Sequence, residues 1–221
     1  MYFLGHMAWA YVWAVIAWAL IPAAKRGGKL FVPAILMLGV LPDVDLLLGG
    51  LGVVHRTVTH SFFLWTVLFI PVFVILRFKA IPYFVAVVQH FAFGDFLMGK
   101  VMLFWPFSSK LVGLGFGMPS VVDVVLETAG LLFALIILVY IGDLKQLFSV
   151  NKRNVFMLLP LLALLTSAVF FLSHWSSIVS LAGYIVSSGL LVTLMLAHVI
   201  LFVLIAISTV QGLRAFRRRA K

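Results

Sequence analysis

The chain of 221 residues contains no cysteine and few charges, since only 10% of its residues are charged. The absence of cysteine excludes disulfide bonds, thiolate metal ligands and cysteine nucleophiles. A soluble domain carries about a quarter charged residues. The low charge, with 65% hydrophobic residues and a mean hydropathy of +1.25, therefore indicates an integral membrane protein. Glycine-rich phosphate loops, GxSxG elbows and HExxH motifs are also missing, and serine-triad chemistry has no support.

Acidic residues are scarce as well, six against sixteen lysines and arginines, which gives a net charge of +10. In a soluble protein this excess would suggest a nucleic-acid partner, but in a membrane protein the positive-inside rule explains it, and no nucleic acid is expected. Seven segments have the roughly 20 apolar residues that a membrane-spanning helix needs. They are 4–22, 30–48, 62–78, 81–104, 121–141, 155–172 and 179–210.

These segments predict an all-α fold, a polytopic transmembrane bundle of about seven spans in one domain, 1–221. Within this domain, residues 1–120 carry the metal-site motifs, and residues 121–221 contribute supporting helices and a basic cytoplasmic tail. With the N-terminus outside, 13 of the 16 lysines and arginines fall on cytoplasmic segments, and only Arg56, Lys100 and Lys110 lie outside. This asymmetry predicts a cytoplasmic C-terminus and a multi-pass protein of the cell membrane.

The few acids and histidines are clustered rather than scattered. With the N-terminus outside, five of the six acids and four of the six histidines fall at the outer ends of the segments. Carboxylates and imidazoles are ligands that Zn²⁺ and Mn²⁺ prefer, and ionisable groups at membrane depth are functional candidates. We predict a site for one or two divalent ions, Zn²⁺ or Mn²⁺, with the ligands His6, Asp43, Asp45, His55, His60, His90 and Asp95.

Spacing leaves alternatives open for several of these ligands. Asp43 and Asp45 can face one ion only if the backbone leaves the α-helix there; otherwise Asp43 caps a helix. Asp95, five positions after His90, needs a local bulge, and Gly94 is where we expect it. His90 could instead form a structural hydrogen bond between helices. The alternatives are an interfacial role for His55 and His60, and a frayed terminus at His6.

Three residues are candidates for catalytic roles. Asp43 or Glu127 could act as the general base, and Arg56 could hold an anionic substrate oxygen because guanidinium matches phosphate geometry. The alternatives are a salt bridge from Glu127 to Lys100 or Lys110 and ordinary snorkelling of Arg56 to the interface. His174 and His198 have no acidic neighbours in the sequence, so we interpret them as structural.

The motifs in order resemble the YdjM-like family of membrane-bound metal-dependent hydrolases. The resemblance rests on His6, Leu-Pro-Asp-Val-Asp at 41–45, His55-Arg56 with Thr59-His60-Ser61, then His90, Asp95, Gly99 and Pro106-Phe107-Ser108. The sequence departs from the family around 89–95, where family members are small and polar. The resemblance covers roughly the first half of the chain and implies a divalent-metal hydrolase of undefined substrate.

These observations lead to one main hypothesis and two rivals. We expect a membrane-embedded metal-dependent hydrolase whose site lies at the external interface, where a lipid or a lipid-linked phosphoester could reach it. The first rival is a metal-ion or proton-coupled transporter, since buried His and Asp also form ion pathways. The second is a non-catalytic membrane scaffold in which the metal only stabilises the fold.

Overall fold

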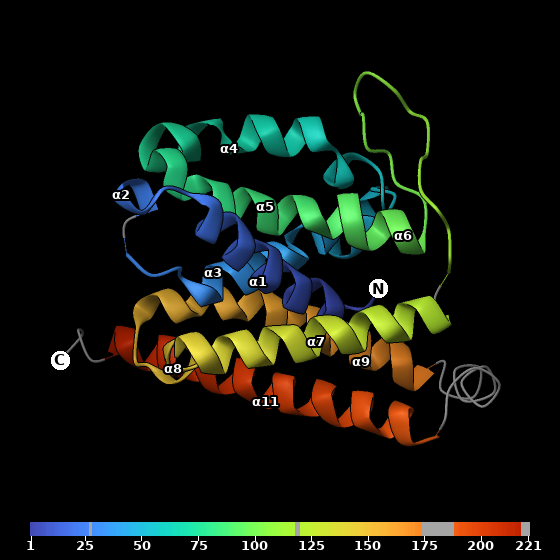
Figure 1. Ribbon diagram of the computed structural model, residues 1–221. Helices are drawn as coiled ribbons and strands as arrows, with labels where there is room; N and C mark the ends of the chain where they lie inside the picture. The colour runs from blue at the N-terminus through green and yellow to red at the C-terminus, as the bar shows by residue number, and fades with distance from the viewer. Residues whose placement is uncertain (27, 118–119, 174–187, 218–221) are drawn as a thin grey trace.

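The computed structural model describes residues 1–26, 28–117, 120–173 and 188–217 (Figure 1). Regular structure in these ranges is helical, apart from one isolated antiparallel bridge between Val101 and Val112. The predicted all-α fold is therefore confirmed. After α6 (Phe96–Met98), residues 99–117 form a loop that extends beyond the helices at one end of the molecule, and α7 (Val121–Ile141) is the next helix.

Four helical stretches are long and apolar enough to cross a membrane, which indicates a membrane protein. They are α1 (Phe3–Leu20), the stretch Phe62–Met98, α7 (Val121–Ile141), and Leu196–Arg217 within α11 (Ser188–Arg217). Residues 179–187 of the predicted seventh segment lie outside the described residues. The prediction of helical membrane spans is confirmed at this coarser level.

The stretch Phe62–Met98 is a helical hairpin rather than one rod. It consists of α4 (Phe62–Leu76), η3 (Arg77–Ala80), α5 (Ile81–Gln89), η4 (His90–Asp95) and α6. The chain turns back at η3, and the ring of Phe84 in α5 packs at 5.3 Å from Phe69 and 5.4 Å from Phe73 in α4, measured between centroids. The predicted segment 62–78 forms one arm of this hairpin, and the predicted segment 81–104 forms the other only as far as Met98, after which residues 99–104 belong to a loop (Figure 1).

Helix α1 lies at the centre of the bundle and packs against α3 (Val32–Val40), α5 and α7. Small residues permit this close approach: a Cβ added to Gly39 of α3 would lie 2.6 Å from the Cβ of Ala10. In a membrane, where apolar burial drives helix association only weakly, such van der Waals contact between small residues stabilises the helix pair.

The segment 30–48 changes its helical form at the two aspartates. The α-helix α3 ends at Val40, and a 3₁₀ helix, η1 (Leu41–Leu51), follows. Pro42 lacks a backbone N–H, so it cannot continue the α-helical hydrogen bonds at this point. The expectation that the backbone leaves the α-helix near Asp43 and Asp45 is confirmed.

The second half of the chain is more regular, with the helices α7, α8 (Lys145–Phe148), α9 (Leu158–Ser173) and α11, and the 3₁₀ turn η5 (Lys152–Met157). The basic elements α2 (Ala23–Arg26) and α8 and the last turns of α11 lie at one end of the bundle, on the left of Figure 1. The first turn of α1 and α6 lie toward the other end. The charged residues of the two signs are therefore largely segregated.

Candidate metal centre

Four side chains from three irregular helices converge at the end of the bundle near α6. One ligand atom from each of Asp43 (η1), His60 (η2, Val58–His60), His90 and Asp95 (both η4) lies within 4.8 Å of all the others. These side chains are 9%, 0%, 0% and 2% exposed, respectively. Buried charges need a compensating partner, because leaving them unpaired in a low-dielectric interior is costly.

The distances within this group fit a small divalent cation. Two ligands at about 2.1 Å from a tetrahedral ion lie about 3.4 Å from each other. Asp95 Oδ2 lies 2.9 Å from His60 Nε2 and 3.4 Å from His90 Nε2. Asp43 Oδ1 lies 3.5 Å and 3.1 Å from the same two nitrogens. The two-histidine, two-carboxylate set is also of the right chemical type for Zn²⁺ or Mn²⁺.

A π-helix brings His90 and Asp95 to the same side. Residues five apart lie on different faces of an α-helix, but η4 has π-helical hydrogen bonding over His90–Asp95, which widens the turn. The predicted bulge is confirmed, and Gly94 lies within it. A Cβ at Gly94 would lie 2.5 Å from Cε1 of His6, so only glycine leaves room for that ring.

The two histidines present their Nε2 atoms to the centre because hydrogen bonds hold their Nδ1 atoms. His90 Nδ1 donates to the carbonyl of Gly39 at 2.7 Å. His60 Nδ1 donates at 3.0 Å to Thr59 Oγ1, which in turn donates to Asp45 Oδ2 at 2.6 Å. Such second contacts fix the tautomer and orientation of metal-binding histidines. Among the described residues, buried His60 Nε2 and Asp95 Oδ2 lie 2.9 Å apart as an ion pair without hydrogen-bond geometry, which fits two ligand atoms that face a common cation.

The carboxylates around His60 also hold a proton on it in the metal-free protein. Burial alone would lower the pKa of His60, but the carboxylates of Asp43, Asp45 and Asp95 outweigh burial and raise the pKa to about 11. A cation among the four ligand atoms would take the place of that proton.

Asp45 and His55 lie beside the four-residue centre and form a second group with His60. Asp45 is fully engaged: its carboxylate accepts from His55 Nδ1 at 2.9 Å, from Arg56 N at 3.2 Å and from Thr59 Oγ1. Asp43 and Asp45 thus lie on opposite sides of the His60 ring, with Asp43 near its Nε2 and Asp45 near its Nδ1 at 3.4 Å.

Arg56 is bound to the centre through Asp95. Its Nη2 donates to Asp95 Oδ1 at 2.8 Å, which leaves Asp95 Oδ2 for the two histidines. Arg56 has a φ of 65°, a left-handed conformation that is uncommon for a residue other than glycine. Its guanidinium packs closely on Gly99, where a side chain would collide with Nη1. The side chain is 23% exposed, so one edge remains open to the outside.

His6 is adjacent to the centre without belonging to the four-residue group. Its ring stacks on that of His90 with centroids 3.8 Å apart, and its Nε2 lies 3.8 Å from Asp95 Oδ1. The sequence-predicted ligands are therefore in one neighbourhood, with four of the seven in direct mutual contact and Asp45, His55 and His6 around them.

Glu127 takes part in a different set of contacts. It accepts from Tyr2 N at 2.6 Å and lies 4.0 Å from Nε2 of His198. The metal-ligand groups among the described residues do not include it. Asp123, one turn before it, lies 3.3 Å from the amino group of Met1. His174 lies outside the described residues.

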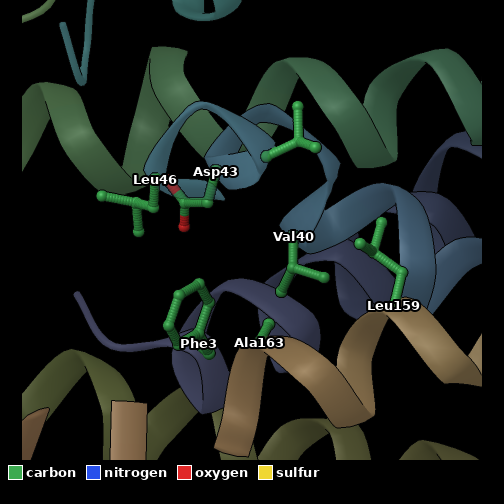
Figure 2. A pocket seen from close by; sticks show the side chains of 7 residues that line it. Phe3, Val40, Asp43, Leu46, Leu159 and Ala163 are labelled. Carbon is green, nitrogen blue, oxygen red and sulfur yellow. The ribbon is translucent and has the colours of Figure 1, made fainter. Parts of the chain in front are cut away.

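A small hollow borders the centre at Asp43. It measures about 20 Å³, roughly enough for one water molecule. Its other lining residues are apolar and come from α1, the α3–η1 segment and α9, among them Phe3, Val40, Leu46 and Ala163. Figure 2 shows the Asp43 carboxylate directed toward this space. Asp43 is thus both a member of the centre and the polar wall of a water-sized site.

Sequence reasoning missed two orienting groups. Thr59 stands in the polar run before His60, so its residue type was a usable signal. The backbone carbonyl of Gly39 could not be predicted, because a backbone group gives no signal in a sequence.

Comparisons with protein-family models, with curated proteins and with solved structures found no match to this chain. The candidate centre therefore stands on its own geometry.

Proposed function

We propose that this protein is a membrane-embedded, metal-dependent hydrolase. The observation that carries the proposal is the buried group Asp43, His60, His90 and Asp95, whose ligand atoms have metal-like spacing, beside a hollow the size of one water molecule. An ion held by these four side chains would need a fifth position for water, and the hollow beside Asp43 is where we place it. The resemblance of the motifs to the YdjM-like family supports the same class of reaction.

The four side chains would hold one Zn²⁺ or Mn²⁺ ion. When bound, such an ion lowers the pKa of a water ligand and polarises the oxygen of a substrate. Asp45 and His55 would serve as orienting groups rather than first ligands, because hydrogen bonds already occupy the Asp45 carboxylate. If a second ion binds, the group Asp45, His55 and His60 is its site.

The chain's own residues have distinct tasks in this proposal. The Asp43 carboxylate accepts a proton from water in the adjacent hollow, and it is better placed than Glu127, which contacts Tyr2 instead. Arg56 positions Asp95 through their hydrogen bond, and its exposed edge faces an anionic substrate oxygen. Thr59 and Gly39 keep the imidazoles of His60 and His90 in the required orientation.

We further propose the full topology of seven spans, an outside N-terminus and a cytoplasmic C-terminus in the cell membrane. The segregation of basic residues away from the centre supports it. The loop after α6 is bonded back to the end of the hairpin, with Leu114 N on Phe96 O at 2.7 Å, and it exposes apolar side chains such as Phe107 at 77%. We place the centre beside this loop at headgroup depth, and we propose a lipid or lipid-linked phosphoester as substrate.

The test is to measure metal content and hydrolysis together on the purified protein. We expect about one Zn²⁺ or Mn²⁺ per chain at the four-ligand centre. We also expect metal-dependent turnover of generic phosphodiesters or phospholipids, lost on chelation and restored by the metal. His60→Ala should lose both properties, and His198→Ala should keep both, since His198 lies outside the centre.

Two results would contradict the proposal and favour its rivals. A metal-replete protein that hydrolyses no phosphoester, ester or amide would support the scaffold. Metal or proton flux into vesicles that depends on Asp43 and His90, without any hydrolysis, would support the transporter.

A further inference from the structure

A basic hollow lies at the end of the bundle away from the metal centre. It measures about 430 Å³, and its walls are Lys25 of α2, Ile75 and Leu76 of α4, and Arg77, Phe78 and Lys79 of η3. The ammonium group of Lys25 lies 4.5 Å from the centroid of the Phe78 ring, so a cation–π contact joins α2 to the turn of the hairpin. Three cations therefore surround a space with an apolar floor.

No acidic side chain of the protein neutralises these three cations. None of the ion pairs among the described residues includes Lys25, Arg77 or Lys79. The whole chain has only six acids, and all of them have their contacts elsewhere: Asp43, Asp45 and Asp95 at the metal centre, Asp123 and Glu127 near the start of α1, and Asp143 with Tyr11. The three exposed cations therefore form a positive patch that an anion from outside the protein can neutralise.

The backbone at Arg77 is unusual in the same place. Arg77 has φ 52° and ψ −131°, and its N–H still donates to Phe73 O at the end of α4. Glycine would adopt this conformation without strain, whereas arginine does so at a cost. A basic side chain is thus present at a position where the backbone favours glycine.

The apolar walls show where the anion comes from. Val74 and Ile75, in the last turn of α4, are 73% and 77% exposed, and α4 belongs to a membrane-spanning stretch. The hollow therefore opens where lipid acyl chains would run along α4 and end at the three cations. Basic pockets at the ends of membrane helices bind anionic lipid headgroups through this combination of charge and apolar surface.

We propose that this hollow binds one anionic phospholipid, with its phosphate among Lys25, Arg77 and Lys79 and an acyl chain along Ile75. A soluble phosphate compound fits less well, because it has no apolar part that could cover the apolar floor. This site is independent of the metal centre and of the proposed hydrolysis.

Native mass spectrometry of the full chain in a neutral detergent tests the proposal, with phosphatidylglycerol and phosphatidylcholine as probes. Each cation beside an anionic headgroup contributes about five-fold in affinity, so we expect one phosphatidylglycerol bound roughly 100-fold more tightly than phosphatidylcholine. The variant Lys25→Gln/Arg77→Gln/Lys79→Gln should lose this preference. The control Lys145→Gln/Lys152→Gln/Arg153→Gln removes the same charge at exposed positions outside the hollow and should retain it.

Two further arms keep the result decisive. Arg77→Gly removes one cation while relieving the backbone, so it should stay folded and lose some of the preference. An excess of sn-glycerol 3-phosphate should not displace the phospholipid. Equal losses in the hollow variant and the control would overturn the proposal, since the cations would then act only as general surface charge. Complete displacement by glycerol phosphate would overturn the assignment to a lipid.

Discussion

The two halves of the chain use helices differently. In the first half, every segment that carries a residue of the four-residue centre departs from α-geometry: η1 and η2 are 3₁₀ helices, and η4 is a π-helix. The other 3₁₀ segments, η3 and η5, form turns between helices. In the second half, α7 runs for 21 residues as an α-helix and exposes apolar side chains such as Ile136 and Val139. The difference indicates that the first half holds donor atoms in position, while the second provides packing surface and contact with lipid.

The largest difference between the two halves should be in metal affinity, when a histidine is removed from each. His90→Ala deletes an imidazole whose Nε2 lies 3.1 Å from Asp43 and 3.4 Å from Asp95, and loss of metal affinity of about 100-fold or more is expected. His198→Ala, in α11, should leave the affinity unchanged. Elemental analysis after dialysis against a weak chelator measures both. Equal metal retention in the two variants would remove the distinction between the halves.

The pH dependence of metal uptake should also arise from a residue of the first half, His60. His60 has a pKa of about 11 in the metal-free protein, so one proton must leave it when a metal binds. Affinity should then rise by at least about ten-fold per pH unit across the neutral range. Isothermal titration in buffers of different ionisation enthalpy counts the released protons, and uptake without proton release would contradict this assignment.

The same pKa has a consequence for stability without metal. The folded protein binds the His60 proton more tightly than the unfolded chain, whose pKa is near 6.5. The contribution of this proton to the free energy of unfolding is therefore complete below about pH 6.5 and is lost as pH rises toward 11. Thermal unfolding of the metal-free protein should shift to lower temperature across that window, and His60→Ala should reduce this pH dependence.

Two glycines offer a matched pair of substitutions. Gly94→Ala places a Cβ 2.5 Å from the His6 ring, so we expect a loss of about 1–3 kcal/mol in stability together with weaker metal binding. Gly142→Ala acts at a left-handed residue, with φ 77°, that ends α7 in open space, so it should cost about 1 kcal/mol and leave metal binding intact. Denaturation and metal titration of both variants check the pair. Unchanged metal affinity in Gly94→Ala would show that the π-turn does not position the ligands.

The smallest effects are expected at two serine caps. Ser61 accepts from Leu64 N at the start of α4, and Ser120 accepts from Asp123 N at the start of α7. Replacement by alanine should cost about 1 kcal/mol at Ser120 and about 1–2 kcal/mol at Ser61, whose buried hydroxyl also donates to the carbonyl of Trp105. Ser61 directly follows His60, so only Ser61→Ala should also weaken metal binding, by a few-fold. A metal titration of both variants decides this, and identical affinities would show that the cap does not position His60.

The sequence predicted residue types and their grouping better than their detailed arrangement. The helical class and the convergence of Asp43, His60, His90 and Asp95 followed from scarce polar residues in an apolar chain, and the bulge at Gly94 followed from the five-residue spacing of His90 and Asp95. The separate place of Glu127 did not, because a shared outer face does not specify which helices touch. Nor did the pairing of Arg56 with Asp95, since a long-range contact of 39 positions depends on the tertiary fold.

The position of the metal in the loaded protein is the most direct test of the central claim. Anomalous diffraction at the zinc edge from crystals of the Zn²⁺-loaded chain should give a peak at about 2.0–2.2 Å from four atoms. These atoms are Asp43 Oδ1, His60 Nε2, His90 Nε2 and Asp95 Oδ2. A peak only elsewhere, for example between Asp123 and Glu127, or loaded crystals without any peak, would contradict the account.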